Sequence, residues 1–191
     1  MKKMTVLLGS PRRGGNSEML ADSLVRGFGG TGGEALTIRL ADLRLGGCVD
    51  CRRCWSSGRP CVIDDDMQSV YLALDEAEIV VFVSPLYWWS WSAQIKPVWD
   101  RLIPYGADGA PRNLSGKGAL LLATAGDEDS GCFEGLRFAF ARGTGYLGMT
   151  HLGEICASGV NAKGAIQGSE WLEKAEALGR SLSAWGTSEE R

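Results

Sequence analysis

The chain alternates between short apolar runs and stretches in which apolar residues recur every three or four positions. The runs predict buried strands, and the spaced stretches predict amphipathic helices. The strand pattern occurs at residues 4–8, 35–39, 79–83, 117–124 and 149–155. The helical pattern occurs at residues 19–28, 67–74, 95–102, 133–140 and 171–182. An alternation of this kind predicts an α/β fold, in which helices cover both faces of a parallel sheet.

Length and charge limit the class of protein. The chain has 191 residues with no internal repeat or linker, which predicts one domain, and residues 186–191 are expected to fray. A net charge of −3 offers no general attraction to nucleic acid or acidic membranes. The uncharged stretch at 79–95 is broken by Pro85 and falls short of the roughly 20 apolar residues of a spanning helix. The opening apolar run is too short for a secretory signal. We therefore expect a cytoplasmic protein with no nucleic-acid or membrane partner.

A glycine-rich loop, GSPRRGGNS at residues 9–17, joins the first predicted strand to the first predicted helix. Anions bind well at this place in open α/β sheets, because backbone N–H groups and the helix dipole point at them. Ser10, Asn16 and Ser17 can donate hydrogen bonds to phosphate oxygens, and Arg12 can add a charge-assisted bond. The loop lacks both the P-loop pattern and the G-x-G-x-x-G dinucleotide fingerprint. A glycine-rich turn without a ligand is the alternative.

Four of the six cysteines lie in a loop of about residues 46–63, with the spacing C-x2-C-x2-C-x6-C: Cys48, Cys51, Cys54 and Cys61. The first three resemble a ferredoxin-type run that holds an iron–sulfur cluster. Zinc sites more often use two C-x2-C pairs set far apart. The first three cysteines are too crowded for disulfides among themselves, and a reducing compartment disfavours disulfides. A cluster, zinc, free redox-labile thiols and a disulfide framework remain the alternatives.

The remaining candidate residues favour structural roles. His151 is the only histidine and lies in the last predicted strand, where a structural role is expected. Cys132 and Cys156 are isolated in the sequence and are interpreted as small core residues. No serine-hydrolase elbow is present. We therefore assign no side chain as a catalytic acid, base or nucleophile.

Three segments resemble the NADPH-dependent FMN reductase-like flavoproteins of the flavodoxin superfamily. The loop at residues 9–17 is similar to the phosphate loop of that group. Residues 84–101 are similar to its second signature, in which a strand ends in S-P-x-Y and a helix carrying K-x-x-x-D-R follows. The cysteine loop, with Asp65-Asp66-Met67 behind it, resembles the iron–sulfur flavoprotein branch. Six residues precede the last cysteine here, where that branch usually has five.

The resemblance implies a fold and a cofactor site. The fold would be a single flavodoxin-like domain over residues 1–191, a doubly wound five-stranded parallel sheet of order 2-1-3-4-5. The FMN phosphate would contact Ser10, Arg12, Asn16 and Ser17. The isoalloxazine ring would lie beside Pro85, Leu86, Tyr87 and Trp88, with Thr124, Ala125 and Gly126 closing the other side. A 4Fe-4S cluster would be held by Cys48, Cys51, Cys54 and Cys61. Packing in the core or at an interface is the alternative for Trp88, Trp89 and Trp91.

The function that the resemblance implies is an FMN-dependent oxidoreductase of the NAD(P)H:acceptor or iron–sulfur flavoprotein type. The flavin would carry the chemistry, and the protein would bind, orient and tune it. A non-enzymatic electron carrier and a redox- or metal-sensing flavoprotein are the alternatives. The resemblance also implies a homo-oligomer, a dimer or tetramer, with a small molecule or a protein as redox partner.

Overall fold

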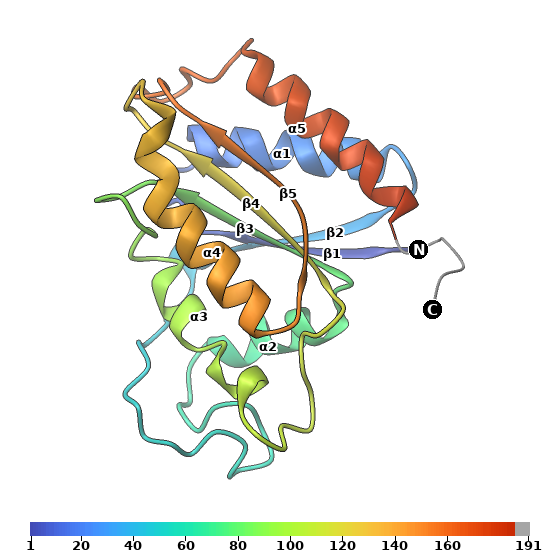
Figure 1. Cartoon of the computed structure of the whole chain (residues 1–191), viewed down its shortest axis with the longest axis vertical. Coiled ribbons are helices and arrows are strands. Elements are labelled where there is room, and N and C mark those ends of the chain that lie inside the picture. The colour runs from blue at the N-terminus through green and yellow to red at the C-terminus, as the bar shows by residue number, and fades with distance from the viewer. Residues whose placement is uncertain (186–191) are drawn as a thin grey trace.

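A five-stranded parallel sheet forms the centre of the computed structural model, which describes residues 1–185 (Figure 1). Its strands are β1 (Lys3–Leu8), β2 (Glu34–Arg39), β3 (Ile79–Pro85), β4 (Gly118–Thr124) and β5 (Thr150–Ala157). They are hydrogen-bonded in the order β2-β1-β3-β4-β5, and all neighbouring pairs are parallel. The predicted flavodoxin-like fold and strand order are therefore confirmed. The predicted frayed end at residues 186–191 lies outside the described residues.

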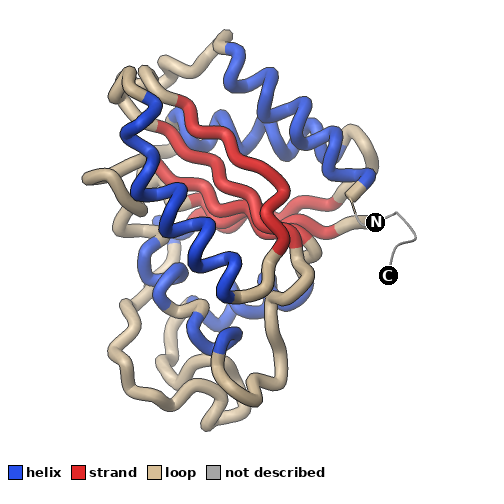
Figure 2. Tube along the Cα trace, viewed as in Figure 1, coloured by secondary structure: helices blue, strands red, loops and turns tan. Residues whose placement is uncertain are grey.

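Helices cover both faces of this sheet, as Figures 1 and 2 show. They are α1 (Asn16–Gly29), α2 (Met67–Glu76), α3 (Lys96–Asp100), α4 (Glu134–Tyr146) and α5 (Glu170–Ser181). Short 3-10 helices lie at Leu40–Asp42, Ile103–Gly106, Ser130–Phe133 and Leu182–Ala184. The third helix is shorter than the predicted 95–102. Pro104 accounts for the early end, because proline has no N–H to donate to the carbonyl oxygen of Asp100.

Two apolar layers hold the helices to the sheet. Side chains alternate along each strand, so Val81 and Val83 of β3 pack with α1 and α5, whereas Val80 and Phe82 pack with α2, α3 and α4. All four side chains are fully buried. The apolar run of β3 is uninterrupted, and such a run predicts a strand that is covered on both faces of the sheet. Among residues 1–185, no helix combines the length and apolar character required to cross a membrane.

The core positions predicted for Cys132 and Cys156 are confirmed, and His151, whose side chain is exposed, lies in the last strand as expected. Cys132 and Cys156 are buried in the layer of α2, α3 and α4. The His151 ring packs edge-on against Phe140, with 5.1 Å between the ring centroids, and its Nε2 lies 3.1 Å from the carbonyl oxygen of Gly153. These contacts place His151 in β5, away from the loops at the carboxyl ends of the strands.

Helices α1 and α5 touch through their backbones. A Cβ atom on Gly27 would lie 2.0 Å from the carbonyl oxygen of Glu176, and one on Gly179 would lie 2.1 Å from the carbonyl oxygen of Leu24. Neither contact can be relieved by rotating a side chain, because the atom approached belongs to the backbone. Glycine at both positions therefore sets the separation of the two helices.

Replacing Gly27 or Gly179 with alanine should push α1 and α5 apart. We expect Gly27→Ala and Gly179→Ala each to lower the free energy of unfolding by about 1–3 kcal/mol, because overpacking outweighs the gain in helix propensity. Gly145→Ala in α4 is the matched control, since no described atom lies within 4 Å of its added Cβ. It should leave the stability unchanged or slightly raised. Urea unfolding followed by circular dichroism measures the difference, and equal stabilities for Gly27→Ala and the wild type would contradict the packing described.

Candidate functional site

A hollow of about 650 Å³, including its solvent-open part, lies at the carboxyl ends of β1, β3 and β4. Every residue predicted for the flavin site except Trp88 lines this hollow: Ser10, Arg12, Asn16, Ser17, Pro85, Leu86, Tyr87, Thr124, Ala125 and Gly126. Three segments distant in the sequence are thus brought together at one edge of the sheet, where open α/β folds bind ligands.

The polar end of the hollow is the start of α1. The helix begins after Gly15, and no side chain within residues 1–185 caps it, so its first N–H groups are available to an anion. The Ser10 and Ser17 side chains lie here and are nearly buried, with 4% and 2% of their surface exposed. Arg12 is exposed at the rim. Buried hydroxyls, free N–H groups and a cation together suit a phosphate.

A buried hydrogen bond joins two of the segments that line the hollow. The Ser17 and Thr124 hydroxyl oxygens are 2.7 Å apart, which ties the start of α1 to the end of β4. The backbone N–H of Leu86 donates to the carbonyl oxygen of Thr124 at 2.8 Å, which ties the loop after β3 to the same point. Thr124 therefore holds the loops after β1, β3 and β4 in one fixed arrangement.

Asn16 holds a fourth segment against the hollow. Its side-chain amide donates to the carbonyl oxygens of Val160 at 2.8 Å and Ala162 at 2.9 Å. Its Oδ1 accepts from the backbone N–H of Gly164 at 2.9 Å. Because both ends of the amide are used, Asn16 positions the loop after β5 as well as lining the hollow.

Sequence reasoning missed that loop. Val160, Asn161 and Lys163 line the hollow, and Lys163 adds a second positive charge near Arg12. One pattern pointed to them: the fifth predicted strand ends at the same sheet edge as the others, so the loop after it reaches the same place. The pairing of this loop with Asn16 spans more than 140 residues and has no local pattern.

Trp88 lies outside the hollow. Trp88 and Trp89 form a two-residue turn with positive φ angles of 52° and 56°, closed by hydrogen bonds of 3.1 Å between Tyr87 and Ser90 in both directions. Non-glycine residues in this conformation cost on the order of 1–3 kcal/mol each and cluster at functional sites. The Trp88 side chain is 89% exposed. Trp91, in contrast, is buried, and its ring centroid lies 4.8 Å from that of Trp99.

The four clustered cysteines line a second hollow, of about 710 Å³, beneath the irregular segment between β2 and α2. Cys48 and Cys51 are exposed, Cys54 is partly buried and Cys61 is buried. All six cysteines of the chain lie within residues 1–185 and are free, so the disulfide alternative is contradicted. Among the described residues, no group of three Cys, His, Asp or Glu side chains is placed to hold a metal ion as it stands. The loop would have to draw its thiols together to do so.

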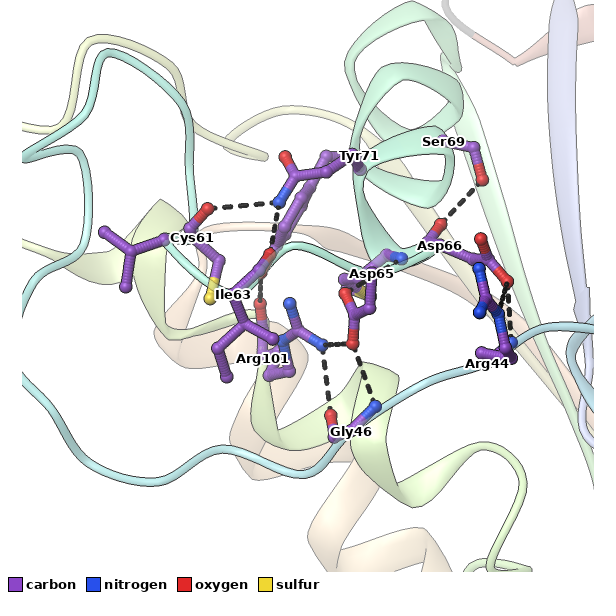
Figure 3. Close-up of polar contacts among 12 residues, drawn as sticks. Arg44, Gly46, Cys61, Ile63, Asp65, Asp66, Ser69, Tyr71 and Arg101 are labelled. Carbon is purple, nitrogen blue, oxygen red and sulfur yellow. Dashed lines mark hydrogen bonds and ion pairs between the residues drawn. The ribbon is translucent and has the colours of Figure 1, made fainter.

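One arginine closes the base of the cysteine loop (Figure 3). The Arg101 side chain is 1% exposed, and its Nη1 donates to Asp65 Oδ2 at 2.6 Å and to the carbonyl oxygen of Gly46 at 3.0 Å. Gly46 precedes the four cysteines and Asp65 follows them. Burial alone would raise the pKa of Asp65, but hydrogen bonds from Arg101 and the backbone N–H of Gly46 hold this pKa below its ordinary value. The carboxylate and guanidinium are therefore both charged.

The other nitrogens of Arg101 provide a test of what the cysteine hollow fits. Nε and Nη2 are buried and have no hydrogen-bond partner within residues 1–185. Arg101 and Cys61 line the same hollow. Buried cationic donors without an acceptor are costly, and they suit a negatively charged acceptor. Four thiols and the unpaired donors of Arg101 line one hollow, so their chemistry suits an iron–sulfur cluster, although the thiols are not placed around one here.

Comparisons with known proteins agree with this geometry. Residues 2–162 match the family described as NADPH-dependent FMN reductase. An iron–sulfur flavoprotein of Archaeoglobus fulgidus is 32% identical over 104 residues, which cover 54% of this chain and 47% of that protein. YwqN of Bacillus subtilis, a proposed NAD(P)H-dependent FMN-containing oxidoreductase, is 27% identical over 184 residues, which cover 92% of this chain and 96% of YwqN. The chain spans about half the length of the iron–sulfur flavoproteins that it matches.

A solved structure shows the same fold. NAD(P)H:quinone oxidoreductase from Methanothermobacter marburgensis superposes with a TM-score of 0.73 at 19% identity, covering 94% of this chain and 95% of that one. The family match extends from β1 into the loop after β5, so it includes every residue that lines the first hollow except Lys163. The chain therefore belongs to the NADPH-dependent FMN reductase family, a flavodoxin-like family of flavin-dependent NAD(P)H oxidoreductases.

Proposed function

We propose that this protein is an FMN-dependent oxidoreductase of the iron–sulfur flavoprotein type, which takes electrons from NAD(P)H and passes them to an acceptor. The observation that carries the proposal is the first hollow, where a helix N-terminus without a side-chain cap and an apolar loop meet at the switch point of the sheet. The family membership supports the same cofactor and donor. A small molecule or a redox protein would serve as acceptor.

The phosphate of FMN would lie at the start of α1. Ser10 and Ser17 would donate hydrogen bonds from their hydroxyls, together with the free N–H groups of the first helical turn. Arg12 and Lys163 would supply positive charge at the rim. Asn16 would keep the loop that carries Lys163 in place through its amide bonds.

The ring of FMN would lie between the loops after β3 and β4. Pro85, Leu86 and Tyr87 line one side of the hollow, and Ala125 and Gly126 line the other. A flat amphipathic ring needs apolar contact and a few placed hydrogen-bonding groups, which backbone atoms of these loops can supply. Bound FMN supplies hydride acceptance from NAD(P)H and electron release. The predicted contact of Trp88 requires its turn to fold over the ring.

The cysteine loop would hold the second redox centre. Cys48, Cys51, Cys54 and Cys61 would be its ligands, because they line one hollow and their chemistry suits a 4Fe-4S cluster. Such a cluster exchanges single electrons. Arg101 would hold the two ends of the loop together through Gly46 and Asp65.

Exposed aromatic side chains support the proposal of a homo-oligomer. Trp88 is 89% exposed and Trp89 59%, both at the turn beside the flavin hollow. Phe138 and Tyr146 of α4 are each 70% exposed. Aromatic residues of this size are enriched at interfaces. A second copy that covers this surface would also shield the flavin.

A flavodoxin-like electron carrier is the second candidate function. Among the residues that line the first hollow, none is a histidine or a carboxylic acid. Electron transfer alone requires no acid or base from the protein, so this lining suits a carrier as well as an enzyme. Direct reduction by NAD(P)H distinguishes the two.

Removing two phosphate contacts should weaken FMN binding. We expect the double substitution Arg12→Ala with Ser17→Ala to cost about 2–4 kcal/mol of binding free energy, from one charged and one neutral hydrogen bond. The preference for FMN over riboflavin, which lacks the phosphate, should fall by the same amount. Isothermal titration of the flavin-free protein measures both.

Arg13 offers the matched control for this experiment. It is adjacent to Arg12, but its guanidinium pairs with Asp42 at 2.7 Å and does not line the hollow. Arg13→Ala should leave FMN affinity within about 0.5 kcal/mol of the wild type. Equal losses in Arg12→Ala and Arg13→Ala would show that the phosphate is not bound where we place it.

Direct reduction tests the enzymatic proposal. When the FMN-loaded protein is mixed with NADPH or NADH in a stopped-flow instrument without oxygen, the flavin absorption should bleach and return when an acceptor such as a quinone is added. The donor should act without any added reductase, because the hollow is open to solvent beside the flavin. Reduction only after a reductase is supplied would favour the electron carrier.

Anaerobic reconstitution tests the proposed cluster. With iron and sulfide, the wild type should take up both and gain broad visible absorption in addition to the flavin bands. Cys51→Ala should lose most of this uptake, whereas Cys132→Ala, which changes a cysteine outside the loop, should retain it. Identical iron content and spectra for the wild type and Cys51→Ala would refute the ligand assignment. Zinc uptake in place of iron would contradict the iron–sulfur cluster.

A further inference from the structure

Arg101 is a buried cation whose position is fixed from several sides. It follows α3 directly, and the Tyr71 hydroxyl donates to its backbone carbonyl oxygen at 2.8 Å. Its Nη1 is bound to Asp65 and Gly46 at the two ends of the cysteine loop. An arginine side chain stays protonated in proteins, and these contacts fix the orientation of its guanidinium.

Three of its five N–H donors are unused. A guanidinium has five N–H donors, and the Asp65 and Gly46 bonds use the two on Nη1. The remaining donors, on Nε and Nη2, are buried with no acceptor in the described part of the chain. In Figure 3 the guanidinium lies between the Asp65 carboxylate and the Cys61 sulfur. The unused donors thus belong to the cysteine hollow, which both Arg101 and Cys61 line.

We propose that Arg101 donates hydrogen bonds from Nε and Nη2 to sulfur atoms of the cluster held by Cys48, Cys51, Cys54 and Cys61, and thereby raises the reduction potential of that cluster. This inference rests on the proposed cluster and adds a residue that is not a ligand. Arg52 and Arg53 line the same hollow, but they lie on its exposed side. Arg101 alone among these arginines reaches the hollow from the protein interior with unpaired donors.

The effect on potential follows from charge. Reduction adds one electron to the cluster, and therefore one negative charge, while no bond to Arg101 forms or breaks. Donors and positive charge next to the sulfurs stabilise the reduced state more than the oxidised state. Water does not screen this interaction, because the side chain is 1% exposed. Removing the donors should therefore make the cluster harder to reduce.

The test compares Arg101→Gln and Arg101→Lys with the wild type after anaerobic reconstitution. Iron, sulfide and FMN content are measured first, and the cluster is then titrated with dithionite and redox mediators while its electron paramagnetic resonance signal is followed. We expect the ratio of reduced to oxidised cluster at a fixed potential to fall about tenfold in Arg101→Gln, which is a shift of about 59 mV for one electron. Arg101→Lys keeps the charge without the planar donors and should shift in the same direction.

Arg52→Gln is the matched control. It removes the same formal charge from the same hollow, but the Arg52 side chain is 84% exposed and pairs only with Asp50 at 3.3 Å among the described residues. Its reduced-to-oxidised ratio should change less than threefold, because water screens an exposed charge. A shift as large as that of Arg101→Gln would show that formal charge alone, and not the buried donors, sets the potential.

A measurement on the wild type guards against variants that do not fold. Hydrogen bonds from N–H groups to cluster sulfurs should shift the iron–sulfur stretching bands in resonance Raman spectra when the protein is exchanged into deuterium oxide, and Arg101→Lys should reduce the shift. If folded, FMN-loaded Arg101 variants fail to retain iron, the deuterium shift of the wild type decides: its presence supports the contact, and its absence overturns it. Equal potentials together with no deuterium shift would overturn the role of Arg101 while the cluster stands. A wild type that binds FMN but no iron would overturn the cluster and this inference together, and one that binds neither would overturn the proposed function as well.

Discussion

The parallel sheet imposes the constraint on which the rest of the structure depends. All five strands end at one edge, and β1 lies between β2 and β3. The chain leaves β1 toward one face, to α1, and approaches β3 from the other face, through α2. The loops after β1 and β3 therefore part, and a crevice opens between them. Both hollows are lined by loops. The sheet fixes where each loop begins and ends, and the residues within the loop can vary to suit a ligand.

Buried polar contacts convert these loops into defined sites. Thr124 joins the loops after β1 and β3 to the end of β4, and Asn16 adds the loop after β5. Arg101 does the same for the cysteine loop, which has no regular secondary structure of its own. A buried polar group is costly unless it is paired, so each of these bonds also disfavours other loop arrangements. The unpaired nitrogens of Arg101 stand out for this reason.

The sequence predicted the parts of this account that depend on local pattern. The positions of the strands follow from the hydrophobic runs. The strand order, and the role of the loop after β1, follow from the resemblance to a known family. Two kinds of feature escaped it. The partners of Asn16 and Arg101 are tens of residues or more away in the chain, and no spacing rule predicts them. The turn at Trp88 and Trp89 has left-handed backbone without the glycine or asparagine that normally marks such a turn.

The position of the flavin is the central claim, and a crystal structure of the protein prepared without oxygen and loaded with FMN tests it most directly. We predict density for the phosphate at the start of α1, beside Ser10 and Ser17, and for the ring between Leu86–Tyr87 and Ala125–Gly126. Density for FMN at any other place, or a flavin-saturated protein whose first hollow holds no flavin, would contradict the account.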